Sequence, residues 1–182
     1  MIKRRQLPFI GKFAFMLLII FSLGFVFYEK SDAVNTPVQL PETVSPLVAV
    51  QKDDSLKNSI VDYGIEFLGT PYVTAGSGRD GFDCSGFVHY VFRHFNIKVP
   101  RTTADFQNFG QEIPIEHVQK GDLLLFLSPT RNVVGHIGIV TSENGRESQF
   151  IHASSGPEMR VIFTDLSKPS YTRRFVKAIR VI

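Results

Sequence analysis

The sequence predicts an α+β domain in which N-terminal helices pack on a mostly antiparallel sheet of about five to six strands. Two helical patterns come first along the chain, and short apolar runs of strand length follow them. Segregation of this kind favours an antiparallel sheet over alternating βαβ units. Because 43% of the 182 residues are hydrophobic, the chain can build one packed core of ordinary size.

The helices are expected in the first half of this domain. The first is capped by Ser55 and runs through about Leu68, and the second begins near Cys84. A short third helix follows within residues 102–110 and is capped by one of the two threonines that open this range. The expected strands are Leu123–Leu127, His136–Thr141, Gln149–Ser154, Val161–Phe163 and Phe175–Val181.

Positive charge is not concentrated in the folded part of the chain. Residues 1–33 hold five of the 20 basic and two of the 17 acidic residues, which leaves 15 of each sign for residues 34–182. A basic surface stripe is the usual feature of proteins that bind nucleic-acid phosphates. None is expected here, and no nucleic-acid partner is predicted.

The first 33 residues have the pattern of an export signal. Three basic residues lie within residues 1–6, and Phe13–Tyr28 is an uncharged run of 16 residues rich in Phe, Leu and Ile. The translocation machinery reads a positive front followed by an apolar stretch, so we expect export to the periplasm or cell envelope. The run is longer than a usual signal peptide segment and shorter than a comfortable membrane span. Cleavage after Ala33 and retention as an inner-membrane anchor both stay open.

Residues 34–54 are interpreted as a linker between this segment and the domain at 55–182. Thr36–Asp54 contains three prolines, no glycine, and neither helical nor strand periodicity, which is typical of an extended chain. If the N-terminal segment is retained in a membrane, such a linker would hold the domain away from the bilayer.

Cys84 is the only cysteine of the chain, so it forms no disulfide within one molecule. A lone cysteine is often a small buried hydrophobic residue. Its place at the start of the second helix favours another interpretation, because unpaired backbone N–H groups and the helix dipole stabilise a thiolate and lower the thiol pKa. Cys84 is therefore a candidate nucleophile, which needs a general base and a group that orients that base.

Five histidines could supply these two groups. His89 and His94 lie too far along the second helix to reach the thiol, and His117 lies in a polar stretch expected at the surface. His136 and His152 each occur in a strand-like run among small and apolar residues. These two are the candidates for the base and the orienting residue.

The turn between the two histidine strands decides whether both side chains share one face. A two-residue loop at Asn144-Gly145 would place His136 and His152 on opposite faces. A three-residue loop over residues 143–145, with Gly145 left-handed in a G1 bulge, places them directly opposite each other on one face. We predict the second register, and a bulge elsewhere in the hairpin would also restore the shared face. Gly138 lies on the same face as His136 and leaves space beside its ring.

Six short motifs occur in order along the chain. They are Gly69-Thr70-Pro71-Tyr72, Asp83-Cys84-Ser85-Gly86-Phe87, Pro100-Arg101-Thr102, Lys120-Gly121-Asp122-Leu123, His136-Ile137-Gly138-Ile139-Val140 and Phe150-Ile151-His152-Ala153. Together they resemble the NlpC family of papain-like bacterial cell-wall peptidases over residues 55–182. The chain departs from the family at Ala75-Gly76, where relatives often have paired glycines, and in a longer hairpin between the histidines. Both differences concern the shape of the substrate groove.

The resemblance implies a Cys–His–His catalytic set that hydrolyses amide bonds in peptidoglycan stem peptides. It makes Cys84 the nucleophile, His136 the general base and acid, and His152 the residue that orients His136. It also places Tyr72 close to the thiol, where its hydroxyl could help the backbone N–H of Cys84 to hold the oxyanion. The bond cut stays open between the D-glutamyl–diamino acid link within one stem and the D-alanyl–diamino acid crosslink between two. No cofactor or metal is implied, and we expect a monomer.

Two roles are open for Asp83. A carboxylate aimed at the sulfur would oppose thiolate formation. Asp83 is therefore expected either to cap the second helix or, together with Ser85, to bind a cationic group of the substrate, as the resemblance allows. Arg101 is expected to hold the segment before the third helix, although an arginine could also meet a stem-peptide carboxylate.

Two other classes of function are compatible with the residue types. Cys84, His136 and His152 could bind a catalytic zinc ion, although no further ligand motif occurs at metal-binding spacing. The domain could also bind the cell wall without cutting it, and loss of the cysteine or of the first histidine would be the sign of such a module. Both residues are present.

Overall fold

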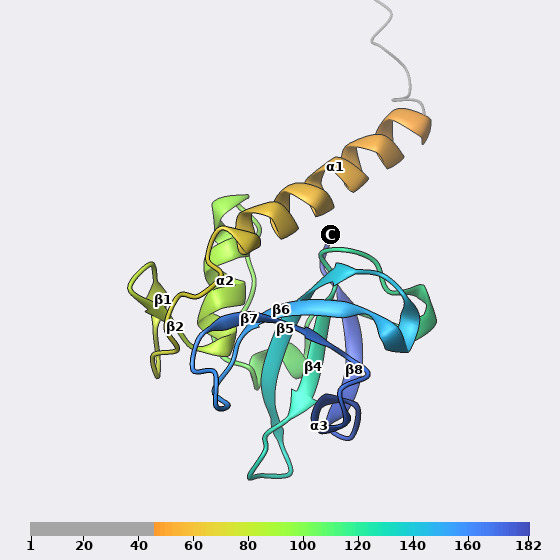
Figure 1. Cartoon of the computed structure of the whole chain (residues 1–182). Coiled ribbons are helices and arrows are strands. Elements are labelled where there is room, and N and C mark those ends of the chain that lie inside the picture. The colour runs from red at the N-terminus through yellow and green to blue at the C-terminus, as the bar shows by residue number, and fades with distance from the viewer. Residues whose placement is uncertain (1–45) are drawn as a thin grey trace, which may run out of the picture. The chain divides into compact units, whose positions relative to one another are not determined.

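The computed structural model describes residues 46–182, shown in colour in Figure 1. Its helices are α1 (Pro46–Ile65), α2 (Cys84–His94) and the short α3 (Pro169–Thr172). Within the described range no helix is both long enough and apolar enough to cross a membrane. The predicted export segment at residues 1–33 lies outside the described residues, as does the linker up to residue 45.

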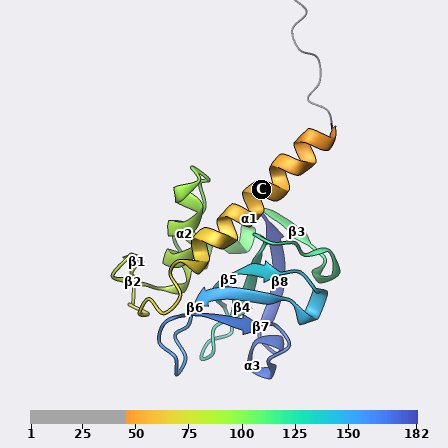
Figure 2. The same cartoon turned by 45° about the horizontal axis from the view of Figure 1, so that its top comes forward.

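Six antiparallel strands form the main sheet in the order β3-β8-β4-β5-β6-β7 (Figure 2). The strands are β3 (Gln111–Ile113), β4 (Leu123–Leu127), β5 (Val134–Ser142), β6 (Gln149–Ala153), β7 (Val161–Asp165) and β8 (Phe175–Arg180). A separate hairpin pairs β1 (Ser77–Gly78) with β2 (Gly81–Phe82). The predicted α+β class and antiparallel sheet are confirmed. All five predicted strands form, whereas β1, β2 and β3 were not predicted because two or three residues carry no readable alternation.

Helix α1 begins nine residues earlier than predicted. Ser55 lies inside the helix rather than at its cap, and the last part of the predicted linker is helical from Pro46. Proline is tolerated in the first turn, and residues 47–55 contain no glycine or proline to interrupt the helix. An ion pair between Asp53 and Lys57, four residues apart, supports the added turns. The helix ends at Ile65, three residues before the predicted end.

Helix α2 lies against β5 and β6, and α1 contacts α2 (Figure 1). The apolar side chains of α2 recur at helical spacing, so they form one buried face. That face belongs to the larger of two core clusters, which includes Phe87, Val88, Val91, Phe92, Leu123, Leu125, Ile137, Ile139 and Ile151. The second cluster fills the other side of the sheet and includes Leu124, Phe126, Val140, Phe150, Tyr171 and Ala178.

The short third helix is a single 3-10 turn, η1 (Asp105–Asn108). Its preceding residue is Ala104, and no side chain caps it, so the prediction that a threonine does so is wrong. Thr102 donates instead to the Asp105 carboxylate at 2.6 Å. Gly110 follows with a φ of +71°, in the left-handed conformation that favours glycine.

The hairpin between β5 and β6 does not have the predicted register. Ile139 pairs with Ile151 and Val140 with Phe150, and the register shifts between Val140 and Ser142. Continued toward the histidines, this register sets His152 two positions from the residue opposite His136. The two side chains therefore share a face without being directly opposite, because an even offset preserves the face. A bulge in β5 and the 3-10 turn η3 (Gly145–Glu147) replace the three-residue loop.

Candidate active site

The first residue of α2 is Cys84, and the preceding Asp83 caps the helix. Asp83 has an extended backbone, and its Oδ1 accepts a hydrogen bond from the Gly86 N–H at 2.6 Å. This contact satisfies one of the free N–H groups of the first helical turn. Of the two roles left open for Asp83, the structure shows the cap. Cys84 itself is 7% exposed and lies at the edge of the main core.

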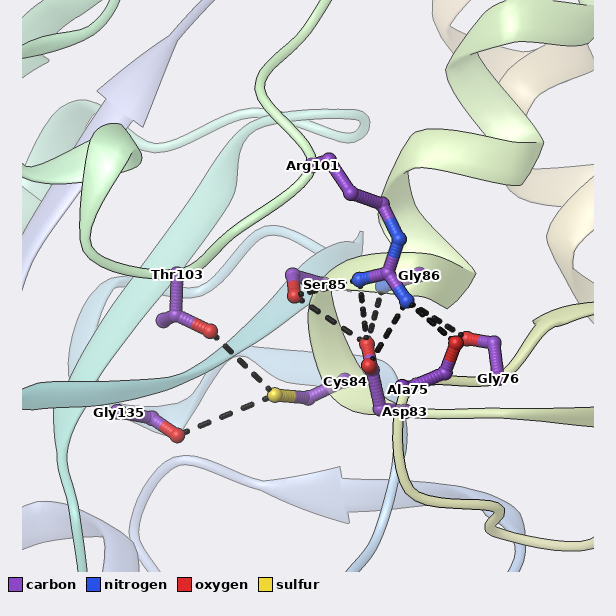
Figure 3. Close-up of polar contacts among 9 residues, drawn as sticks. All are labelled: Ala75, Gly76, Asp83, Cys84, Ser85, Gly86, Arg101, Thr103 and Gly135. Carbon is purple, nitrogen blue, oxygen red and sulfur yellow. Dashed lines mark hydrogen bonds and ion pairs between the residues drawn. The ribbon is translucent and has the colours of Figure 1, made fainter.

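The sulfur of Cys84 lies between two segments that are distant in sequence (Figure 3). Thr103 Oγ1 is 3.6 Å from Sγ, and the Gly135 carbonyl oxygen is 3.9 Å from it. Strand β5 is paired with β6 only from Ile139 onward, so residues 134–138 at the start of β5 are not paired with β6. The thiol therefore lies against the backbone next to His136, although Sγ makes no hydrogen bond to an imidazole within the described residues.

The protonation state of Cys84 differs from the sequence prediction. Burial raises the pKa of the Cys84 thiol above its ordinary value, and the nearby Asp83 charge raises it further. The hydrogen bond with Thr103 and backbone N–H groups act in the opposite direction without reversing the shift. The prediction of a lowered thiol pKa is therefore wrong, because desolvation outweighs the stabilisation expected at the helix start. The resting residue is a neutral thiol at neutral pH.

His136 and His152 are joined by a hydrogen bond of 2.9 Å between His136 Nε2 and His152 Nδ1. Their rings are nearly perpendicular, at 89°. His152 is fully buried, and its Nε2 lies 3.0 Å from the hydroxyl of Thr164 on β7 and 3.4 Å from that of Tyr171 on α3. Counting only residues 46–182, every ring nitrogen of the pair except His136 Nδ1 thus has a partner.

The environment of both histidines favours the neutral imidazole. Burial lowers the pKa of His136 to about 3, with a smaller contribution from the positive charge of Arg174. Burial also lowers the pKa of His152 well below its ordinary value, and the neighbouring His136 adds to the effect. Phe150 and Tyr171 pack on the His152 ring and exclude water from it. A neutral His136 can accept a proton at its free Nδ1.

Arg101 holds Asp83 in a two-pronged ion pair (Figure 3). Its Nη1 donates to Asp83 Oδ1 and its Nη2 to Asp83 Oδ2, both at 2.9 Å. The same guanidinium donates to the backbone carbonyls of Ala75 and Gly76 at 2.9 and 3.2 Å. The Ser85 hydroxyl donates to Asp83 Oδ1 at 3.2 Å. Arg101 thus ties the loop before β1 to the start of α2, a wider role than the one predicted.

A groove of about 540 Å³ opens onto the sulfur. Its lining includes Cys84, Asp83 and Ser85 together with Tyr72, Thr74, Ala75, Arg101, Thr102, Thr103 and Gly135. Burial raises the pKa of the Tyr72 hydroxyl, and the charges of Cys84 and Asp83 raise it further, as expected for a phenol near both groups. The predicted residues Tyr72, Asp83, Cys84 and Ser85 therefore meet in one groove.

The other three histidines belong to other environments. The His94 ring stacks on Tyr63 with centroids 3.8 Å apart, and His89 Nδ1 is 3.1 Å from the Val99 carbonyl. His117 is exposed at the end of the 3-10 turn η2 (Ile115–His117). Thr103, Thr164 and Tyr171 complete the surroundings of the predicted set and were not identified from the sequence. Thr164 lies one residue beyond the predicted end of its strand.

The donor groups of this site do not converge on a common point where a metal could bind. His136 Nε2 and His152 Nδ1 point at each other, so neither is directed at the sulfur. Among residues 46–182 no group of three His, Cys, Asp or Glu side chains is arranged to hold a metal ion. The three predicted residues therefore do not fit a tetrahedral zinc site.

Comparison with known proteins agrees with the fold and with the motifs. The sequence model of the NlpC/P60 family matches residues 69–180. This chain belongs to the NlpC/P60 family. The predicted relationship to papain-like cell-wall peptidases is confirmed at the level of the family, and the match includes Cys84, His136 and His152.

Relatives and solved structures of the NlpC/P60 family extend this result. The chain is 34% identical to the murein DD-endopeptidase MepS/murein LD-carboxypeptidase of Escherichia coli K12, over 70% of this chain and 64% of that protein. It is 32% identical to a gamma-D-glutamyl-L-lysine dipeptidyl-peptidase of Bacillus cereus, over 69% of this chain and 36% of that protein. A crystal structure of a B. cereus NlpC/P60 family protein aligns with a TM-score of 0.62 and 31% identity, over 69% of this chain and 40% of the other.

Proposed function

We propose that this NlpC/P60 protein is an exported cysteine peptidase that hydrolyses amide bonds in peptidoglycan stem peptides through Cys84, His136 and His152. The observation that carries the proposal is the buried His136–His152 hydrogen bond, together with a thiol at the start of a helix whose sulfur lies 3.9 Å from the carbonyl oxygen of Gly135, the residue before His136. A nucleophile, a base and a group that orients the base are the parts that thiol-dependent acyl transfer requires.

The reaction begins with a neutral thiol and a neutral imidazole. His136 Nδ1 accepts the proton of Cys84 as the sulfur rotates from Thr103 toward the ring and attacks the substrate carbonyl. The oxygen of the tetrahedral intermediate is held by the Cys84 backbone N–H, and the Tyr72 hydroxyl assists from the same groove. His136 then protonates the leaving amine. Water, deprotonated by His136, releases the acyl group from sulfur and restores the thiol.

His152 acts by fixing the orientation of His136. The 2.9 Å hydrogen bond to His136 Nε2 prevents rotation of the ring, so Nδ1 stays directed away from the histidine pair. It also stabilises the imidazolium that forms when His136 holds the thiol proton. Burial of His152 keeps water from competing for that bond.

Two bonds are candidates for cleavage. Similarity to the E. coli DD-endopeptidase supports the D-alanyl–diamino acid crosslink between two stems. Similarity to the B. cereus dipeptidyl-peptidase supports the D-glutamyl–diamino acid bond within one stem. The E. coli alignment extends over a larger share of the relative, and we propose the crosslink as the first bond to test.

The proposed location of the enzyme rests on the sequence alone. The basic residues before Phe13–Tyr28 and the apolar run itself support export across the inner membrane. We propose that the domain acts in the periplasm or cell envelope, either freed by cleavage or anchored through this segment. N-terminal sequencing of the protein purified from membranes and from the soluble envelope fraction separates the two outcomes.

Digestion of purified sacculi tests the proposal. The wild-type protein is expected to release soluble fragments, and mass spectrometry of the fragments identifies the bond that was cut. Cys84→Ser should retain the fold and lose digestion. His89→Gln, which changes a histidine on the same helix outside the groove, is the matched control and should digest normally. Equal digestion by Cys84→Ser and wild type would reject the thiol mechanism, and binding without digestion by the wild type would favour a wall-binding module.

A further inference from the structure

The hydrogen bonds of the histidine pair continue to a third residue. His152 Nε2 lies 3.0 Å from Thr164 Oγ1, on the side of the ring opposite His136. Thr164 belongs to β7, the strand next to β6, and shares a face with His152 because its partner Phe150 is two residues from His152. Thr164 is 6% exposed, so bulk water does not replace its hydroxyl at this contact.

The positions of the protons along this chain of groups are linked. Each neutral imidazole has one N–H and one nitrogen that accepts. In one arrangement His136 Nε2–H donates to His152 Nδ1, and His152 Nε2–H donates to Thr164. In the other arrangement every donor is reversed: Thr164 donates to His152 Nε2, and His152 Nδ1–H donates to His136 Nε2.

Only the first arrangement gives a base. It leaves a lone pair on His136 Nδ1, which can accept the thiol proton. In the reversed arrangement Nδ1 already carries a proton, so His136 cannot deprotonate Cys84. The general base proposed above therefore requires an acceptor at His152 Nε2, and the Thr164 hydroxyl is the nearest oxygen to that atom.

We propose that Thr164 is a positioning residue that sets the tautomers of His152 and His136 by accepting the His152 Nε2–H. This inference rests on the proposed peptidase function and adds to it a residue outside the Cys–His–His set. Thr164 touches neither the sulfur nor the groove that opens onto it. Thr164 acts on the proton of His136 through the imidazole rings of His152 and His136, and its hydroxyl is the group that does so.

Tyr171 is the second oxygen near His152 Nε2 and serves as a contrast. Its hydroxyl is 3.4 Å away, a longer contact than that of Thr164. If the Thr164 hydroxyl is removed, the Nε2–H loses its 3.0 Å acceptor and keeps only the longer 3.4 Å contact with the Tyr171 oxygen, whereas a bare Nε2 can accept from the Tyr171 O–H. Removal of the Thr164 hydroxyl is therefore expected to favour the reversed arrangement. Removal of the Tyr171 hydroxyl leaves the Thr164 acceptor in place.

The test combines ring-state spectroscopy with kinetics on the purified protein. Nitrogen-15 NMR of histidine-labelled protein shows which ring nitrogen carries the proton. In the wild type both His136 and His152 should carry it on Nε2. Thr164→Val, which keeps the shape and removes the hydroxyl, should move both protons to Nδ1. It should also lower kcat on sacculus-derived peptides at least about tenfold with little change in KM.

Three further variants keep the test decisive. Thr164→Ser restores the hydroxyl and should restore the wild-type ring states and kcat to within about threefold. Tyr171→Phe should keep the wild-type ring states. If circular dichroism shows that Thr164→Val is not folded, Thr164→Ala is used in its place. Unchanged ring states in whichever of Thr164→Val and Thr164→Ala is folded would overturn the proposal, as would a Thr164→Ser variant as impaired as that variant.

The NMR and the kinetic measurements together also separate this inference from the peptidase function on which it rests. If the wild type cuts no peptidoglycan and Thr164→Val nevertheless reverses the ring protons, the peptidase function fails and the linked tautomers are supported. If the wild type is active and the ring protons of Thr164→Val stay on Nε2, the peptidase function stands and the inference is rejected.

Discussion

His136 on β5 and His152 on β6 lie on one face of the sheet, with Nε2 of the first 2.9 Å from Nδ1 of the second. The rings are not cross-strand partners, because the register sets them two positions apart. This diagonal offset lets the rings meet edge to face at 89°. It leaves Nδ1 of His136 as the one ring nitrogen of the pair without a hydrogen-bond partner among the described residues.

The buried histidines should make the fold sensitive to acid. The pKa of His136 is lowered to about 3 in the folded chain, against an ordinary value near 6.5 when unfolded. Above pH 6.5 neither state binds the proton. As the pH falls from 6.5 toward 3, the unfolded state binds it and the folded state does not, so stability is lost by up to about 1.4 kcal/mol per pH unit.

Urea unfolding from pH 7 to pH 4 measures this loss. His136→Asn removes the His136 imidazole and should flatten the dependence of the unfolding free energy on pH. The substitution also lowers the unfolding free energy at pH 7. A wild-type free energy that stays constant between pH 6.5 and pH 4 would contradict the buried neutral histidine.

Gly138 should be required for the histidine pair. A Cβ added there would lie 2.5 Å from Phe150 Cδ2 and 3.1 Å from His152 Cβ, closer than packed atoms allow. Gly138→Ala is therefore expected to cost about 1–3 kcal/mol and to displace the His152 ring, with loss of activity. Gly78→Ala is the matched control, because nothing lies within 4 Å of the added atom. Equal unfolding free energies and activities for the two variants would refute this role of Gly138.

Ala75 is held in a conformation that favours glycine. Its φ is +61°, at the position where the NlpC family often has the first of two glycines, and its carbonyl accepts from Arg101. Ala75→Gly should relieve the steric cost and raise the unfolding free energy by up to about 1 kcal/mol. Ala104→Gly is the opposite control, since φ there is −63° and the substitution should destabilise. Chemical denaturation measures both, and a destabilised Ala75→Gly would show that the left-handed φ is not strained.

The thiol should react slowly at neutral pH in the absence of substrate. Burial raises the pKa of Cys84, so the thiolate becomes abundant only above the usual thiol range. Alkylation of Cys84 by iodoacetamide should therefore accelerate most steeply at alkaline pH. Thr103→Val removes a hydrogen bond that lowers the pKa and should shift the profile further upward. A profile already flat between pH 6 and pH 8 would indicate a resting thiolate instead.

The placement of Cys84, the proposed nucleophile, could be predicted because its signals are local. A capping carboxylate at residue 83 and the apolar spacing after it define the start of α2 at Cys84. The shared face of His136 and His152 was also predictable, since any even offset between the strands preserves it. The register itself was not, because a bulge in β5 and a 3-10 turn in the connection carry no distinct sequence signal.

The remaining parts of the site depend on long-range contacts. Arg101 meets Asp83 across 18 positions, Thr164 reaches His152 through the pairing of β6 with β7, and Tyr171 reaches it from α3. The shift of the thiol pKa was mispredicted for a related reason. The helix start is visible in the sequence, whereas the burial that dominates the shift arises only when Thr103 and the first residues of β5 close over Cys84.

Trapping of the acyl-enzyme shows whether the Cys84 sulfur attacks the stem-peptide carbonyl. The protein is mixed with soluble crosslinked stem peptides, quenched in acid within the first turnover, digested and analysed by mass spectrometry. A thioester-linked acyl fragment is expected on the peptide that contains Cys84, and none in Cys84→Ser. Release of product by Cys84→Ser at the wild-type rate, with no adduct on the wild-type sulfur, would contradict attack by the Cys84 sulfur.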